Sequence, residues 1–87
     1  MSSASRWEIL YTRRAVKDIE ALDRVAKKRL AGRMEVLRLD PLGLSKKLVN
    51  AKIGHYRYRV GDYRVVFDLS GASLIVLRVG HRRDIYR

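Results

Sequence analysis

The stretch HYRYRVGDYRVVF, residues 55–67, decides the fold of this 87-residue chain. Aromatic and β-branched residues alternate with arginines on both sides of Gly61 and Asp62, a pair that is frequent in two-residue hairpin turns. This pattern predicts two antiparallel strands, at residues 56–60 and 63–69, joined by a tight turn.

The residues before this hairpin predict one strand followed by two helices. Residues 6–11 alternate as a strand does, and Thr12 and Asp23 are suitable N-caps for two successive helices. The apolar positions that we expect to face the core are Trp7, Ile9 and Tyr11 on the strand, Ala15, Val16, Ile19 and Leu22 on the first helix, and Ala26, Leu30, Met34 and Leu37 on the second. Pro41 stops helical propagation, so the second helix is expected to end near Leu39.

After a turn at residues 40–43 the spacing of apolar residues changes from the helical period to the period of two residues that is typical of strands. Besides the central hairpin, we expect a short strand at residues 46–49 and a last strand at residues 74–80, preceded by a turn at residues 70–72. The predicted fold is therefore α+β: an N-terminal strand, a helical hairpin and an antiparallel β-meander, with the helices packed on one face of a twisted sheet.

Composition predicts one small domain over residues 1–87, of which residues 1–5 are expected to be a flexible leader. Hydrophobic residues make up 47% of the chain, which is enough for a packed core. There is no cysteine, no signal-peptide pattern and no apolar run of membrane-spanning length. We therefore expect a cytoplasmic protein that does not enter a membrane.

Charge is the outlying property of the chain. Twenty Lys and Arg against nine Asp and Glu give a formal net charge of +11, and the isoelectric point is about 10.7. Such a field favours polyanionic partners such as nucleic acid, an anionic membrane surface or an acidic protein. Charge alone does not select among these classes.

The alternation of side chains along a strand predicts which face of the sheet carries the arginines. Arg57 and Arg59 are two residues apart and therefore share the face of the strand that points away from the core. Arg64, near the start of the next strand, lies on that same face if Val65 points into the core. Residues 81–87, HRRDIYR, bring further cationic and aromatic groups to one end of the sheet. Whether that end is the one that carries the arginines depends on the strand register, which alternation does not determine.

Two interpretations of these arginines are open from the pattern. Guanidinium groups held on one rigid surface suit phosphate, to whose oxygens they make paired hydrogen bonds, and tyrosines between them offer stacking surfaces for unpaired bases. Alternatively, the arginines form a solvated sheet face, and the tyrosines fill positions favoured in strands.

The ordered motif resembles a known family. The run KKLVNAKIGHYRYRVGDYRVVF, followed by IVLRVGHRRDIYR, is similar to the RelE branch of the RelE/ParE toxin superfamily, and the similarity extends over nearly the whole chain. The resemblance implies a ribosome-dependent endoribonuclease that cleaves mRNA in the decoding site and is neutralised by a cognate antitoxin. It also implies that the partners are a RelB-like antitoxin and the ribosome with its mRNA and ribosomal RNA.

The resemblance also implies roles for individual residues. Arg57 and Arg59 match paired basic positions that contact the scissile phosphate, and Arg64 matches an arginine that stabilises the transition state. Arg82 matches a catalytic arginine after the last strand, and Tyr86 matches a tyrosine that stacks on a base. The paired strand positions are lysines in the best-studied members, one of them proposed as the general base. Because arginine does not readily lose a proton at neutral pH, the base is left unassigned by the resemblance.

His81 is the candidate for proton transfer, because its unperturbed pKa of about 6.5 lies near working pH. A structural or surface histidine at a strand end is the competing interpretation. The sequence holds no cysteine and neither a cluster of carboxylates nor a pair of nearby histidines, so no metal and no other cofactor is expected.

The remaining cations have two interpretations, an ordinary solvated surface or contacts to ribosomal RNA that add salt-dependent affinity. The resemblance favours the second. The candidate RNA- and ribosome-binding residues are Lys17, Lys27, Lys28, Arg29, Arg33, Lys46 and Lys47.

Two other functions compete with a nuclease. A ParE-like toxin would inhibit DNA gyrase by protein contact, and a non-catalytic module would bind RNA or the ribosome without cutting. The presence of all the arginine positions argues against the first, and the arginines in place of lysines leave the second open.

Overall fold

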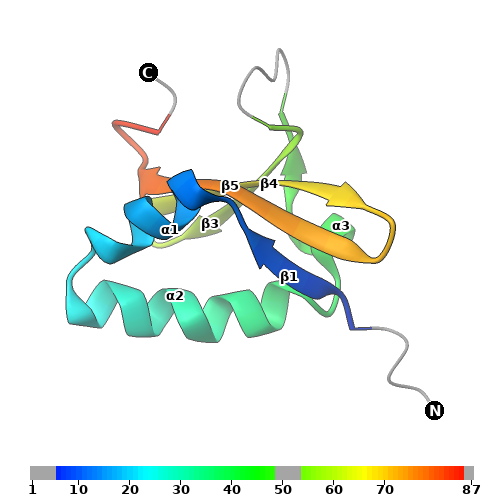
Figure 1. Ribbon diagram of the computed structural model, residues 1–87, viewed down its shortest axis with the longest axis horizontal. Coiled ribbons are helices and arrows are strands. Elements are labelled where there is room, and N and C mark those ends of the chain that lie inside the picture. Colours follow the sequence, from blue (N-terminus) through cyan, green and yellow to red (C-terminus); the bar gives the residue numbers. More distant parts are fainter. Residues whose placement is uncertain (1–5, 49–53, 86–87) are drawn as a thin grey trace.

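The computed structural model describes residues 6–48 and 54–85, arranged as three helices and a five-stranded sheet (Figure 1). The elements in chain order are β1 (Glu8–Tyr11), α1 (Arg13–Glu20), α2 (Arg24–Leu37), α3 (Pro41–Leu44), β2 (Lys46–Lys47), β3 (Tyr56–Val60), β4 (Tyr63–Ser70) and β5 (Ser73–His81). The predicted α+β class and the order of the elements are confirmed.

The central hairpin forms as the sequence predicts. Tyr56 pairs with Phe67 and Val60 pairs with Tyr63, so β3 and β4 are antiparallel around the Gly61–Asp62 turn. Gly61 has a φ of +59°, the left-handed conformation that glycine adopts at little cost. β5 continues the meander on the other side of β4.

The core lies between the helices and one face of the sheet. Tyr58, Val60, Val65 and Phe67 from the hairpin are buried there, and Tyr56 stacks on Phe67 with ring centroids 5.5 Å apart. The helices contribute the buried residues Ala15, Leu30, Met34 and Leu37, while Ile19 and Leu22 are partly buried against them. Tyr56 and Tyr58 are therefore packing residues, which agrees with the second interpretation of the tyrosines given above.

Both predicted helix caps are present. The Thr12 hydroxyl accepts a hydrogen bond from the backbone N–H of Ala15 at 3.1 Å, and the Asp23 carboxylate accepts one from Ala26 at 2.7 Å. Each cap satisfies an N–H group that has no partner within its own helix.

The N-terminal strand pairs with the last one. The sheet order is β1-β5-β4-β3-β2, and β1 runs parallel to β5, which makes the sheet mixed. β1 ends where Tyr11 pairs with Val76, and α1 protects the edge of β5 beyond that point. The Thr12 hydroxyl donates to the carbonyl of Leu77 at 3.1 Å, and Asp18 accepts from the backbone N–H of Val79 at 2.9 Å. An edge that would otherwise offer free backbone groups is thus covered.

A β-bulge lies in β5. Val66 pairs with Arg78 whereas Phe67 pairs with Val76, so Leu77 is the extra residue. The bulge shifts the side-chain alternation by one, and both Val76 and Val79 consequently face the helices.

Four local predictions differ from the structure. Residues 40–43 are not a simple turn, because Pro41 starts the one-turn helix α3, which Asp40 caps through the N–H of Gly43. Val16 on the first helix and Tyr11 on the first strand were both expected to face the core, but they are 42% and 43% exposed. The short strand predicted at 46–49 is seen at Lys46–Lys47, and residue 49 lies outside the described residues.

Candidate nucleic-acid interface

Cationic side chains gather on the sheet face opposite the helices. Arg57 and Arg59 project from β3 on this face, Arg64 from β4, and Lys46 comes from β2, where it pairs with Arg57. These four residues line a hollow of about 250 Å³, which we call the arginine hollow. All four lining side chains carry a positive charge, so the hollow suits an anion.

Strand pairing brings like charges close together in this hollow. Arg59 lies directly opposite Arg64 in the β3–β4 ladder. Like charges at directly opposed positions destabilise a sheet. Within the described residues no carboxylate forms an ion pair with Arg57 or Arg59. The arrangement is therefore one that an added anion would stabilise.

Arg64 is the most buried of these groups, with 7% of its surface exposed. Its Nη1 donates hydrogen bonds to the carbonyl oxygens of Gly61 and Tyr63, both at 2.9 Å. These bonds hold the guanidinium at the base of the β3–β4 turn. The backbone of the hairpin thus restricts the orientation of this guanidinium.

The strand register shows which end of the sheet carries the end of β5. Arg64 pairs with Gly80, Tyr63 pairs with His81, and the backbone N–H of Arg82 donates to Asp62 at 2.8 Å. His81 and the exposed Arg82 therefore lie at the turn end of the hairpin, the end to which the Arg64 guanidinium reaches.

His81 lies on the other face of the sheet from the arginine hollow. Its ring meets the ring of Tyr63 edge to face at a centroid distance of 5.8 Å, and Tyr63 belongs to the helix side of β4. Its Nδ1 accepts a hydrogen bond from the backbone N–H of Arg83 at 3.2 Å. In the neutral ring the proton is then on Nε2. The structure thus brings the strand arginines together but does not place His81 among the lining residues.

The C-terminal turn is fixed against the arginine-bearing face. Ile85 is buried, and a Cβ built on Gly80 would lie 3.3 Å from its Cδ1. The backbone N–H groups of Asp84 and Ile85 both donate to the carbonyl of His81. This packing fixes the turn that carries Arg82, which is not among the residues that line the hollow, whereas Tyr86 lies outside the described residues.

The cations of the helices point outward, as expected, but two of them make defined contacts. The Arg33 guanidinium lies over the Tyr58 ring, 5.7 Å from its centroid, a cation–π geometry. Arg29 extends to the β3–β4 turn, where its Nη1 would lie 3.2 Å from a Cβ built on Gly61. The remaining candidates, Lys17, Lys27, Lys28 and Lys47, are exposed.

Sequence reasoning missed an apolar groove between the two helices. Tyr11, Val16, Ile19, Leu30 and Met34 are among the residues that line this hollow of about 300 Å³. Partial burial raises the pKa of the Tyr11 phenol, and the nearby Glu35 carboxylate raises it further, while Arg38 opposes the shift. The signal available in the sequence was Val16, because it widens the apolar stripe of the first helix beyond what one core face needs. In the structure Val16 is exposed.

Within residues 6–48 and 54–85, no three His, Cys, Asp or Glu side chains are grouped so that they could hold a metal ion. His55 makes a hydrogen bond from its ring Nδ1 to Asp68 at 2.7 Å, and this pair is partly exposed. In the same part of the chain, no helix is long and apolar enough to cross a membrane.

Comparisons with known proteins match both the sequence and the fold. The family described as "ParE toxin of type II toxin-antitoxin system, parDE" matches residues 9–86. Toxin RelE3 of Methanocaldococcus jannaschii is 31% identical over 83 residues, which cover 91% of this chain and 94% of that protein.

Solved structures extend the similarity to three dimensions. The toxin–antitoxin complex RelBE2 from Mycobacterium tuberculosis contains a chain that superposes with a TM-score of 0.80 at 24% identity, over 88% of this chain and 99% of that one. The RelB–RelE complex from Methanococcus jannaschii gives a TM-score of 0.69 at 32% identity, over 88% and 94% of the two chains.

Proposed function

Because this chain belongs to the RelE/ParE superfamily of toxins from type II toxin–antitoxin systems, we propose that it inhibits translation as a ribosome-dependent endoribonuclease. The observation that carries the proposal is the arginine hollow, in which four cations from three strands surround a space without a lining carboxylate. A phosphodiester of mRNA in the ribosomal decoding site is the proposed occupant, and the cytoplasm is the proposed place of action.

The proposed reaction is cleavage of RNA by its own 2′-hydroxyl. The 2′-oxygen forms a bond to the adjacent phosphorus, the bond from phosphorus to the 5′-oxygen breaks, and the proton of the hydroxyl is removed while the leaving oxygen gains one. Arg57 and Arg59 bind the phosphate oxygens, and the fixed guanidinium of Arg64 stabilises the extra negative charge of the five-coordinate phosphorus. Arg82 approaches from the turn end of the hairpin. Tyr86 is proposed to stack on a neighbouring base.

Proton transfer is the part that the strand arginines do not supply, since guanidinium stays protonated at neutral pH. We assign it to His81 as a proposal. The His81 ring lies on the helix side of the sheet end, so this role requires the RNA to pass around the Gly61–Asp62 turn. Alignment of the 2′-hydroxyl by the ribosome reduces the need for a strong base.

The outer cations are proposed to bind the ribosome. Each Lys or Arg that neutralises an RNA phosphate adds affinity that falls with salt. The proposed contacts are Lys17, Lys27, Lys28, Arg29, Arg33, Lys46 and Lys47.

We propose an acidic RelB-like antitoxin as the second partner. The net charge of +11 attracts an acidic segment, and the apolar groove between α1 and α2 offers contact area for its hydrophobic side chains. The similar chains from M. tuberculosis and M. jannaschii were solved in toxin–antitoxin complexes.

Primer extension on a defined mRNA tests the proposal. Programmed ribosomes, ribosome-free mRNA and a parallel DNA gyrase supercoiling assay receive the same folded protein. Cuts that require ribosomes support the nuclease. Intact mRNA with loss of supercoiling would favour a gyrase inhibitor, and intact mRNA with stalled ribosomes would favour a binding module.

A further inference from the structure

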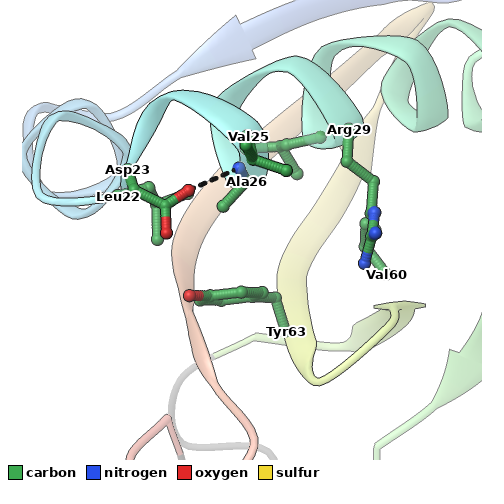
Figure 2. A pocket seen from close by; sticks show the side chains of 8 residues that line it. Leu22, Asp23, Val25, Ala26, Arg29, Val60 and Tyr63 are labelled. Atoms are coloured by element: carbon green, nitrogen blue, oxygen red, sulfur yellow. Dashed lines mark hydrogen bonds between the residues drawn. The ribbon is translucent and has the colours of Figure 1, made fainter.

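A second pocket lies on the helix side of the sheet, between the first turns of α2 and the end of the β3–β4 hairpin (Figure 2). Its volume is about 160 Å³, and its walls include Ala26 and the partly buried Tyr63. Two charged side chains, Asp23 and Arg29, also line it. We call it the turn pocket.

The Gly61–Asp62 turn connects this pocket to the arginine hollow. Arg29 reaches Gly61 from the helix side, where its Nη1 would lie 3.2 Å from a built Cβ, and Arg64 donates to the Gly61 carbonyl from the other side. Arg82 is tied to the adjacent Asp62. Cations therefore border the turn on both faces of the sheet, and a polyanion can follow them from the hollow to the pocket.

The Tyr63 ring gives the pocket a flat apolar floor. Figure 2 shows the ring edge-on, with one face turned toward the first turn of α2. The edge-to-face contact with His81 fixes the orientation of the ring. Unpaired bases stack on tyrosine rings held in this way.

The size of the pocket favours a small base. A protein cavity of roughly 150 Å³ accommodates one benzene ring. The turn pocket has about 160 Å³, which is enough for the single ring of a pyrimidine but small for the fused rings of a purine.

The charged groups distinguish between the two pyrimidines. Oδ1 of Asp23 is engaged by the N–H of Ala26, and the other carboxylate oxygen is turned toward Tyr63 in Figure 2. A carboxylate accepts from the exocyclic amino group of cytosine but is repelled by the O4 oxygen that uracil has at that position. Arg29 supplies donors for the ring carbonyl or for the neighbouring phosphate.

We propose that the turn pocket is a subsite for an unpaired cytosine of single-stranded RNA whose backbone passes around the Gly61–Asp62 turn. The inference rests on the proposed function only for the identity of the RNA as substrate. The pocket and the arginine hollow then hold neighbouring parts of one RNA strand on opposite faces of the sheet.

Binding of short RNAs to the free toxin tests this inference without ribosomes. The probes are fluorescently labelled hexamers of cytidine and of uridine, fully 2′-O-methylated so that they resist cleavage, and affinity is measured by fluorescence anisotropy. The cytidine hexamer is expected to bind about tenfold more tightly than the uridine hexamer, the difference made by one charge-assisted hydrogen bond.

Three variants locate the binding. Tyr63→Leu removes the ring and is expected to weaken binding of the cytidine hexamer roughly 5- to 150-fold. Tyr63→Phe keeps the ring and is expected to bind the hexamer with wild-type affinity. Asp23→Asn preserves the helix cap and is expected to abolish the preference for cytidine. Arg24→Gln removes a cation of α2 that does not line the pocket, and it serves as the control for charge alone.

Equal binding of the two wild-type hexamers overturns the cytosine subsite, as does unchanged affinity of a Tyr63→Leu protein with native circular dichroism. Should Tyr63→Leu not fold, a cytidine preference that survives in Asp23→Asn overturns it equally. The primer-extension assay separates this result from the proposed function. Ribosomal cleavage without a cytidine preference would contradict only the cytosine subsite. Cytidine binding in the pocket without cleavage would contradict only the proposed nuclease activity.

Discussion

Replacing Arg59 by glutamine is expected to make the free protein more stable. Arg59 lies directly opposite Arg64, and neither Arg57 nor Arg59 forms an ion pair with a carboxylate in the described part of the chain. Relief of this repulsion should raise the free energy of unfolding by about 0.2–0.5 kcal/mol, the lower part of the range for directly opposed pairs, because Arg59 is exposed. For a domain of this size the corresponding rise in Tm is about 1–4 °C.

Thermal unfolding followed by circular dichroism measures the effect at two salt concentrations. The stabilisation should be present at about 10 mM salt, where the Debye length is about 30 Å, and should vanish at about 1 M, where it is about 3 Å. Lys47→Gln is the matched control, since Lys47 is a strand cation that pairs with Tyr56 rather than with another cation. A fall in Tm, or a rise that persists at high salt, would refute the repulsion argument.

Three further predictions concern the scaffold. Asp18→Ala should lower the free energy of unfolding in urea by about 1–3 kcal/mol, because the Val79 N–H loses its acceptor, and Asp18→Asn should lose less; equal stability of all three proteins would contradict this. Gly54→Ala should cost about 1–3 kcal/mol by overpacking, since its Cβ would lie 2.5 Å from Val66 Cγ1; an unchanged Tm would show that the neighbours yield. The raised pKa of Tyr11 stabilises the folded protein fully below pH 10.0, and this contribution is lost as the pH rises through the raised value, so Tyr11→Phe should lose less stability in alkali than wild type; parallel pH profiles would argue against it.

Local sequence signals predicted most of the fold correctly. The period-two alternation around Gly61 fixed which side chains of β3 face the helices, and Thr12 and Asp23 cap their helices as expected. These features depend on neighbouring residues in the chain, so the sequence contains the information needed to predict them.

Features that depend on distant contacts were not predictable in the same way. The parallel pairing of β1 with β5 joins the two ends of the chain, and the bulge at Leu77 changes the alternation by one residue. The one-turn helix α3 is a local exception: its cap comes from Asp40, three residues from Gly43, but Asp is also favoured in turns, so the sequence did not distinguish a turn from a short helix.

In the candidate site, too, features set by local sequence were predictable and features set by strand pairing were not. Alternation placed Arg57 and Arg59 on one face, and the hairpin brought Arg64 beside them. The placement of Lys46 in the hollow required the β2–β3 pairing, and the position of His81 on the other face required the β4–β5 register. Neither pairing follows from the composition of the strands.

The most direct test of the central claim is the single-turnover rate of mRNA cleavage on programmed ribosomes, with wild type, the Arg57→Gln and Arg64→Gln variants, and Arg24→Gln as the control for charge. Each hollow variant is expected to cleave about 10²- to 10³-fold more slowly than wild type, and the control is expected to cleave at nearly the wild-type rate. The upstream product should carry a 2′,3′-cyclic phosphate. Cleavage by the hollow variants at the rate of the control would contradict a catalytic role for the arginine hollow.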